Sequence, residues 1–242
     1  MENGNEQDLV IAGSGSSGGG RFRQVRIDGY GKLLSDIDCV EFGTNGKSEV
    51  RGSLQAEKAS INGSIRIHGA VRISDTLEVN GETKIDGDAG FRQLKGKGST
   101  TVGGSLNGEI VDVEGGINVE GDCEAETVIV QGGFRIGGLL SGGIIDVTMY
   151  WPCQAEEIGG EKIMVRRSGL KSFLNPFLPK FASKQLKADT IEGDEIYLEH
   201  TVAQTVRGNR ITIGPGCVIQ RVEYKHSMDR DKGAQINEIK QL

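Results

Sequence analysis

Apolar residues recur along this chain at alternate positions, in short runs that polar residues and glycines separate. Pairs such as Ala59/Ile61, Leu77/Val79 and Val111/Val113 stand two residues apart, with a polar residue between the two members. Because successive side chains of a strand point to opposite faces, this alternation predicts strands that are buried on one face. We expect strands of about four to five residues each.

Glycine pairs mark the period of this pattern. Two glycines six residues apart recur every 17 or 18 residues, at Gly46/Gly52, Gly63/Gly69, Gly81/Gly87, Gly98/Gly104, Gly115/Gly121 and Gly132/Gly138. A unit this short cannot bury its own apolar face, so it must stack on its neighbours. Glycine suits the corners, where φ is often positive and a Cβ would clash. Three short strands per repeat predict an all-β parallel β-helix of about ten coils, with 17-residue repeats and a triangular apolar core.

Outward positions of the repeats also form columns. Glu49, Arg66 and Lys84 fall in one column, and Arg51, His68 and Asp86 fall in another. Neighbouring charges on adjacent strands of a sheet can pair. We therefore expect solvated charge ladders, with His68 a surface residue beside Asp86 and not a catalytic base.

Breaks in the repeat divide the chain into five segments. They are a polar N-terminal tail (1–8), the main repeat region (9–165), a basic and aromatic insert (166–185), further coils (186–224) and a polar C-terminal tail (225–242) with at most a short helix. Pro176 and Pro179 exclude a long continuous helix from the insert. The insert is either a flap on the β-helix or a loop that docks on a membrane surface or a partner. The candidate residues for such docking are Arg166, Arg167, Lys171, Phe173, Phe177, Lys180 and Phe181.

Composition narrows the class of protein. A net charge of -6 argues against general nucleic-acid binding. No apolar run is long enough to cross a membrane, and the N-terminus lacks a signal-peptide core, so we expect a cytoplasmic protein. The four cysteines lack metal-ligand spacing, and Cys39 and Cys123 fall at inward positions, so we expect buried thiols and no metal or cofactor.

Catalytic chemistry has little support in the sequence. The segment 13–20, GSGSSGGG, lacks the GK[ST] ending of a phosphate loop and is interpreted as a glycine-rich corner. None of the three histidines stands at a usable spacing from a cysteine, serine or acid, so the protein is not expected to be an enzyme. The alternative is a β-helix enzyme, either a carbohydrate-active protein or a hexapeptide-type transferase, whose repeat the segment 211–219 resembles.

The repeated G-x-x-x-[VI]-x-G coil resembles the bactofilins, the polymer-forming cytoskeletal proteins of bacteria. The segments GSGSSGGGRFRQVRIDGYGKL (13–33) and IEGDEIYLEHTVAQTVRG with ITIGPGCVIQRVEY (191–224) are similar to a longer Gram-positive branch of that family. The resemblance implies a right-handed β-helix that assembles into filaments without nucleotide. It also implies a scaffold near the inner face of the membrane, in cell shape, appendage assembly or motility.

Self-assembly suggests where contacts should lie. The first and last strands of a β-helix expose unpaired backbone N–H and C=O groups. Filaments of the family are non-polar, which implies that like ends meet. The candidate contacts are Leu9, Val10 and Ile11 at one end and Val222 and Tyr224 at the other. The expected partners are further copies of this chain, a paralogous bactofilin and, peripherally, a membrane.

Overall fold

The protein folds into two compact units, unit 1 (Met1–Gly121) and unit 2 (Asp122–Leu242). The computed structural model describes residues 7–168 and 184–242. Every regular element in these residues is a β-strand, and they contain no helix. The all-β prediction is therefore confirmed.

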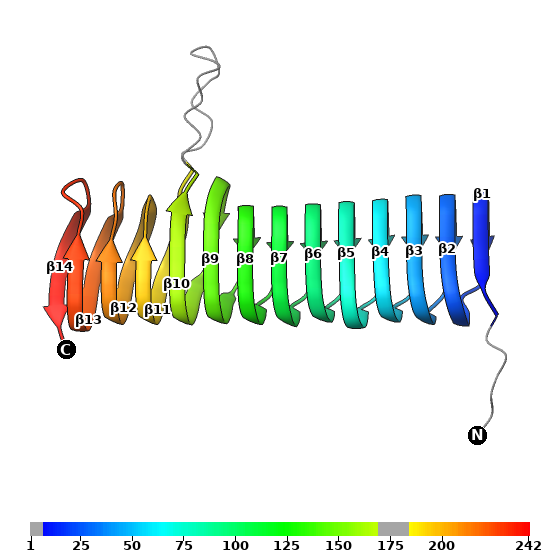
Figure 1. Cartoon of the computed structure of the whole chain (residues 1–242), viewed down its shortest axis with the longest axis horizontal. Coiled ribbons are helices and arrows are strands. Elements are labelled where there is room, and N and C mark those ends of the chain that lie inside the picture. Colours follow the sequence, from blue (N-terminus) through cyan, green and yellow to red (C-terminus); the bar gives the residue numbers. More distant parts are fainter. Residues whose placement is uncertain (1–6, 169–183) are drawn as a thin grey trace, which may run out of the picture. The chain divides into compact units, whose positions relative to one another are not determined.

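Unit 1 is a stack of seven parallel strands, each paired with the strand before it in the sequence (Figure 1). The strands are β1 (Leu9–Ser17), β2 (Gly20–Leu33), β3 (Ile37–Val50), β4 (Leu54–Ile67), β5 (Val71–Ile85), β6 (Ala89–Val102) and β7 (Leu106–Val119). Each strand from β3 to β7 is one turn of a solenoid.

Unit 2 repeats the arrangement with a second set of parallel strands, β8 to β14. They are β8 (Cys123–Ile136), β9 (Leu139–Gln154), β10 (Glu157–Arg167), β11 (Leu186–Leu198), β12 (Thr201–Ile213), β13 (Val218–Arg230) and β14 (Gln235–Gln241). Strand β11 pairs with β10 and, through Leu186 and Lys187, also with β9. Residues 184–185 precede β11, and the turn that β10 begins is completed by the start of β11.

Each full turn places six side chains inward, and we number these inward positions 1 to 6. In β3 they are Ile37, Cys39, Phe42, Thr44, Ser48 and Val50, all buried. In β8 the same spacing holds for Cys123, Ala125, Val128, Val130, Phe134 and Ile136. In-register pairing stacks equal positions, so Val50, Ile67, Ile85, Val102 and Val119 form one buried column in unit 1. The columns predicted from the glycine alignment are confirmed.

The two glycines of a pair have different roles. The first members of the five pairs in unit 1 have positive φ, between 129° and 146°: Gly46, Gly63, Gly81, Gly98 and Gly115. A Cβ at Gly63 would lie 2.2 Å from the carbonyl oxygen of Gly46 on the turn below. The second members lie where one strand ends and the next begins, and a Cβ at Gly69 would lie 2.7 Å from the amide nitrogen of Ser53. The prediction of glycine corners is confirmed. Positive φ and close approach between turns both require glycine at the first members, whereas close approach alone requires it at the second members.

Two details of the predicted architecture are wrong. The predicted three short strands per coil are one continuous strand of 14 to 16 residues in each full turn from β3 to β9, because the ladder continues around the corners. The described residues also hold more turns than the ten predicted. One reason is that residues 225–242, predicted to be a tail, complete β13 and form β14.

The C-terminal segment 225–242 is not a tail with a short helix. It completes β13 and forms β14, whose residues Gln235–Gln241 pair with Val218–Tyr224. Ile236 stacks on Ile219 and Ile239 stacks on Val222, which extends two core columns by one strand. Backbone pairing with β13 and the stacking of these two isoleucines on its core residues explain why a segment this polar is a strand.

The outward columns form ladders as expected. Glu49, Arg66 and Lys84 are in register, and the Arg66 guanidinium pairs with Asp86 at 3.0 Å. His68 Nδ1 lies 2.9 Å from Asp86 Oδ2, which confirms His68 as a surface ladder residue. A second ladder runs along the corner, where Asn62 Nδ2 donates to Asn45 Oδ1 at 3.1 Å and Asn80 Nδ2 donates to Asn62 Oδ1 at 3.0 Å.

Candidate functional site

The predicted N-terminal contacts lie on the first strand of unit 1. Among the described residues, β1 pairs only with β2, so its outer backbone edge has no strand partner there. Ile11 is buried, Leu9 is half-buried, and Val10 is 61% exposed on the outward face. The edge is uncharged, because the segment 9–17 carries no charged residue.

The predicted C-terminal contacts are not at the edge of unit 2. Val222 and Tyr224 lie in β13, and β14 covers them. Val222 is fully buried, so it is a core residue and not a free contact. The outermost strand in the described part of unit 2 is β14, where Ile239 is 44% exposed because no further turn stacks on it.

Both edges are stepped, because β1 and β14 are each about half a turn. In unit 1, β1 pairs with Val25–Leu33 of β2 and leaves the outer edge of Gly20–Phe22 without a described strand partner. In unit 2, β14 pairs with Val218–Tyr224 of β13 and leaves the outer edge of Lys225–Arg230 without a described strand partner. Figure 1 shows β1 and β14 as the first and last strands of their units. Each edge is therefore a half-turn beside an uncovered half-turn.

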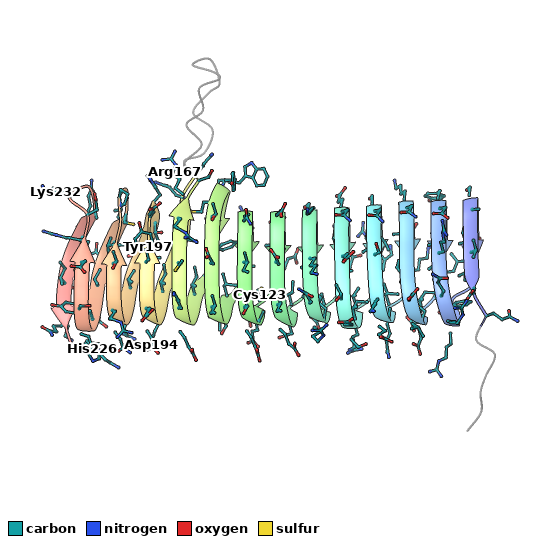
Figure 2. The ribbon with its side chains drawn as sticks, viewed as in Figure 1. Cys123, Arg167, Asp194, Tyr197, His226 and Lys232 are labelled. Carbon is teal, nitrogen blue, oxygen red and sulfur yellow. The ribbon has the colours of Figure 1, made fainter. Side chains whose placement is uncertain are left out.

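The predicted docking residues are only partly described. Lys171, Phe173, Phe177, Lys180 and Phe181 lie outside the described residues. Arg166 and Arg167 are the last two residues of β10, and Figure 2 shows Arg167 where that strand ends. Arg166 Nη2 pairs with Asp146, 2.7 Å from Oδ2, and the Arg167 amide donates to Glu199 Oε2 at 2.9 Å. The Arg166 charge is thus already engaged within unit 2.

The sequence pattern did not predict an exposed tryptophan that lies near the end of β10. The register of β9 on β8 moves from Met149 opposite Gly132 to Cys153 opposite Phe134, so Tyr150–Pro152 form a bulge. Trp151, the chain's one tryptophan, is 56% exposed in that bulge. Arg167 pairs with Met149, so the bulge and the end of β10 are neighbours. The sequence signal for this bulge is YWPC (150–153), which lies where the glycine period ends.

A titratable cluster also forms where β11 turns into β12. The Tyr197 hydroxyl donates to Glu199 Oε1 at 2.7 Å, and this hydrogen bond raises the pKa of Tyr197 to about 12. Burial and the nearby Arg167 charge lower the pKa of His200. His200 has φ of 47° and packs on Gly216, where a Cβ would lie 2.4 Å from the imidazole Nδ1. The close packing of the ring indicates a structural corner.

The cysteines are structural as well. All four are free and buried, as predicted for Cys39 and Cys123. Burial raises the pKa of Cys217 to about 11, and its Sγ donates to the Leu198 carbonyl at 3.3 Å. The thiolate is the reactive species of cysteine, so a thiol with this pKa is a poor nucleophile near neutral pH. In residues 7–168 and 184–242, no group of three or more His, Cys, Asp or Glu side chains could hold a metal ion.

Each unit has a groove that runs along inward position 2. In unit 1 a groove of ≈ 660 Å³ includes Cys39, Ala56 and Gly108 in its lining. In unit 2 a groove of ≈ 420 Å³ follows the glycine column of Gly160, Gly193 and Gly208.

The polar rim of the unit 2 groove is engaged with itself. Arg207 pairs with Glu192 at 3.4 Å and with Glu223 at 2.8 Å, and Asn209 Nδ2 donates to Asp194 at 2.5 Å. Figure 2 shows Asp194 and His226 along the lower side of the unit 2 strands, and Arg167 and Lys232 along their upper side. These contacts form a polar ladder along the rim of the groove.

Relatives of this chain are proteins of Bacillus subtilis (strain 168). No family model and no solved structure matches. "Uncharacterized protein YhbE" is 38% identical over 231 residues, which cover 95% of this chain and 96% of YhbE. "Uncharacterized protein YhbF" is 44% identical over 89 residues, which cover 36% of this chain and 34% of YhbF. The match to YhbE spans both solenoid units, so this chain belongs to the same protein family as YhbE.

Proposed function

We propose that this protein is a bactofilin-like structural scaffold that self-assembles through the edges of its solenoid, without nucleotide. The observation that carries the proposal is the pair of outermost strands, β1 with Leu9 and β14 with Ile239 at inward positions, each without a strand partner on its outer side in the described residues. Such an edge is a template for pairing with another chain. Contacts of this kind that do not close into a ring give open filaments.

Within residues 7–168 and 184–242, the edges carry few of the features by which soluble proteins prevent such pairing. Charged side chains, prolines and covering loops are the usual protections of an edge strand. The segment 9–17 contains neither charges nor proline, and β14 contains one acid, one base and no proline. A further turn on either edge would bury apolar surface that is now exposed. The gain is about 25 cal/mol for each Å² of apolar surface.

Sedimentation and negative-stain microscopy of the purified protein, with and without nucleotide, test this proposal. The edge variants are Leu9→Asp and Ile239→Asp, at inward positions that another strand would cover, and Val40→Asp is the control, because Val40 is 42% exposed within β3. A charge buried in the contact costs several kcal/mol, and about 1.4 kcal/mol is tenfold in affinity. We expect wild type and Val40→Asp to sediment, and each edge variant to need more than about 100-fold higher concentration.

Equal sedimentation of all four proteins would refute assembly through the edges. Far-UV circular dichroism and thermal unfolding show whether each variant keeps its fold. Because the two edge variants lie in different units, loss of structure in one leaves the other informative.

We further propose that the scaffold contacts a membrane on the side of the Trp151 bulge, in support of cell shape, appendage assembly or motility. Tryptophan favours the interfacial region of a bilayer, and basic residues attract anionic headgroups. Trp151 is 56% exposed, and its neighbour Arg167 ends β10 and belongs to the basic and aromatic segment 166–185. In the described residues, no helix is long and apolar enough to cross a membrane.

A further inference from the structure

A second groove of unit 2 lies along inward position 6. Its volume is ≈ 570 Å³, and its floor consists of buried aliphatic side chains: Ile136, Ala155, Ala188 and Ala203. The outward residues before and after each floor residue form its two walls. The groove crosses β8, β9, β11 and β12, which pair directly with one another at this position. Strands in a sheet lie about 4.8 Å apart, so the groove runs about 14 Å along the stack.

The two walls carry opposite charges. One wall is basic, and its exposed residues are Arg135, Gln154 and Lys187. The opposite wall is acidic, and its exposed residues are Glu156, Asp189 and Gln204. The Asp189 amide donates to the Glu156 carbonyl at 2.9 Å, so the two carboxylates stand on neighbouring strands. Like charges in such a position destabilise a sheet. The fold itself therefore gains nothing from this arrangement of charges.

The charges of the walls are also unpaired. Within residues 7–168 and 184–242, none of the four charged wall residues has an ion pair or a side-chain hydrogen bond. Other arginines of unit 2 are paired: Arg166 with Asp146, Arg207 with Glu223 and Arg210 with Glu195. The groove of unit 1 differs as well, because each of its walls carries both signs: Asp38 and Arg72 on one, and Glu57, Arg92 and Glu109 on the other. The position 6 groove thus combines separated signs with free charges.

We propose that this groove binds an extended peptide segment of a partner protein, with acidic side chains against the basic wall and a basic side chain against the acidic wall. Charge complementarity carries the inference, because each free group can form a charge-assisted hydrogen bond with an opposite charge. A nucleic acid or an anionic lipid would meet the acidic wall with a like charge. The inference does not rest on the proposed self-assembly, since no lining residue of the groove lies in β1 or β14.

The spacing of the wall charges favours one conformation of the peptide. Arg135 and Lys187 lie two strands apart, at about 9.6 Å along the groove. A polyproline II helix rises about 3.1 Å per residue with three residues per turn, so its residues i and i+3 face one side about 9.3 Å apart. Residues i and i+2 of a β-strand are about 6.6 Å apart, which is too short. The acidic residues of the peptide should therefore stand three positions apart.

The acidic wall defines the residue between them. Glu156 and Asp189 are about 4.8 Å apart, so one lysine ammonium group can lie between their carboxylates. That level of the groove is closer to Lys187 than to Arg135, because Asp189 and Lys187 share β11 and Glu156 is on the strand beside it. The peptide that fits is acid, proline, lysine, acid, or acid, lysine, proline, acid for the opposite direction along the groove.

Fluorescence anisotropy with labelled peptides tests the inference on the full chain. The peptides GPEPKEPG and GPEKPEPG carry the two orders, and Glu and Lys are exchanged in their partners GPKPEKPG and GPKEPKPG. Wild type is compared with a swap variant that combines Arg135→Glu, Glu156→Lys, Lys187→Glu and Asp189→Lys. These four substitutions leave the net charge unchanged, and all four side chains are exposed. Lys162→Glu is the control, because Lys162 is exposed in β10 outside the groove. Far-UV circular dichroism checks the fold of each variant.

We expect wild type and Lys162→Glu to bind one of the first two peptides at least about tenfold more tightly than its charge-exchanged partner, and the swap variant to reverse this preference. Binding should weaken as the salt concentration rises, because exposed charges are screened. Equal affinity for both members of a pair, a preference that the swap does not reverse, or no binding below about 1 mM would overturn the inference. It would also be overturned if neither protein bound a peptide and the swap changed sedimentation, since the groove would then be a contact between copies of this chain.

Discussion

The stacked corner glycines make Gly63→Ala the sharpest test of the fold. Gly63 has φ of 129°, and a Cβ there would lie 2.2 Å from the Gly46 carbonyl oxygen and 3.0 Å from the Gly46 carbonyl carbon. Gly43 is the matched control on the neighbouring strand, because a Cβ there would meet only the Val25 carbonyl oxygen, at 3.9 Å. One added methyl group thus tests the corner against an open position of the same unit.

The expected magnitude follows from two costs. A residue with a Cβ in this backbone region costs about 1–3 kcal/mol, and the overlap with Gly46 forces the turns apart by about 1 Å at extra cost. We therefore expect Gly63→Ala to lose at least about 3 kcal/mol, or roughly 6–12 °C in Tm for a chain of this size. Gly43→Ala should be neutral or gain about 0.4–1 kcal/mol, because alanine restricts the unfolded chain.

Thermal unfolding followed by circular dichroism measures the difference. Hydrogen exchange shows where it arises, because neighbouring turns in a solenoid depend on each other directly. Amides of β3, β4 and β5 should exchange faster in Gly63→Ala, while those of β7 change little. If Gly63→Ala and Gly43→Ala unfold at the same temperature, the inference that close approach of turns requires glycine is wrong.

Two further predictions concern the thiols and the tryptophan. Burial raises the pKa of Cys39, Cys123 and Cys153 to about 12, above the value of 9.0 for a free thiol, so their stabilising contribution is complete below pH 9 and is lost as pH rises towards 12. Urea midpoints should fall above pH 9, by up to about 1.4 kcal/mol per pH unit for each thiol, and a slope for Cys123→Ala as steep as wild type would contradict this. Trp151 should shift its fluorescence to the blue with vesicles of anionic lipid but not with phosphatidylcholine alone, and Trp151→Ser should float less with them. An unchanged spectrum and unchanged flotation would exclude this bulge as the membrane contact.

Much of the core could be predicted because the repeat is local. Alternation assigns the inward side chains, and the glycine pairs assign the corners, so columns such as Val50, Ile67 and Ile85 follow from spacing alone. The hydrophobic pattern does not reveal one of the six inward columns. Position 5 holds Ser48, Thr83 and Thr100, which are buried although they are polar. Thr44 compensates Ser48 through a hydrogen bond of 2.5 Å between their hydroxyl oxygens, a partnership that hydropathy does not reveal.

The candidate site was harder to predict because edges are properties of the stack. Val222 and Tyr224 carry the last clear alternation in the sequence, yet β14 covers both. The segment QINEIKQ contains only two apolar residues, and each is buried in part only because Ile219 or Val222 lies beneath it. The Trp151 bulge is similar, since an insertion in β9 is visible only when its register on β8 is known.

The sequence by itself determined the unit of this protein, a turn of about 17 residues with glycine corners and an apolar interior, because side-chain alternation and glycine tolerance are local properties of the chain. Only the tertiary structure decided which strands are outermost and at which inward position each one begins or ends. The physical reason is that a strand edge is defined by the absence of a neighbour on one side. The half-turns at β1 and β14 therefore become visible only after the strands of each unit have been stacked in register.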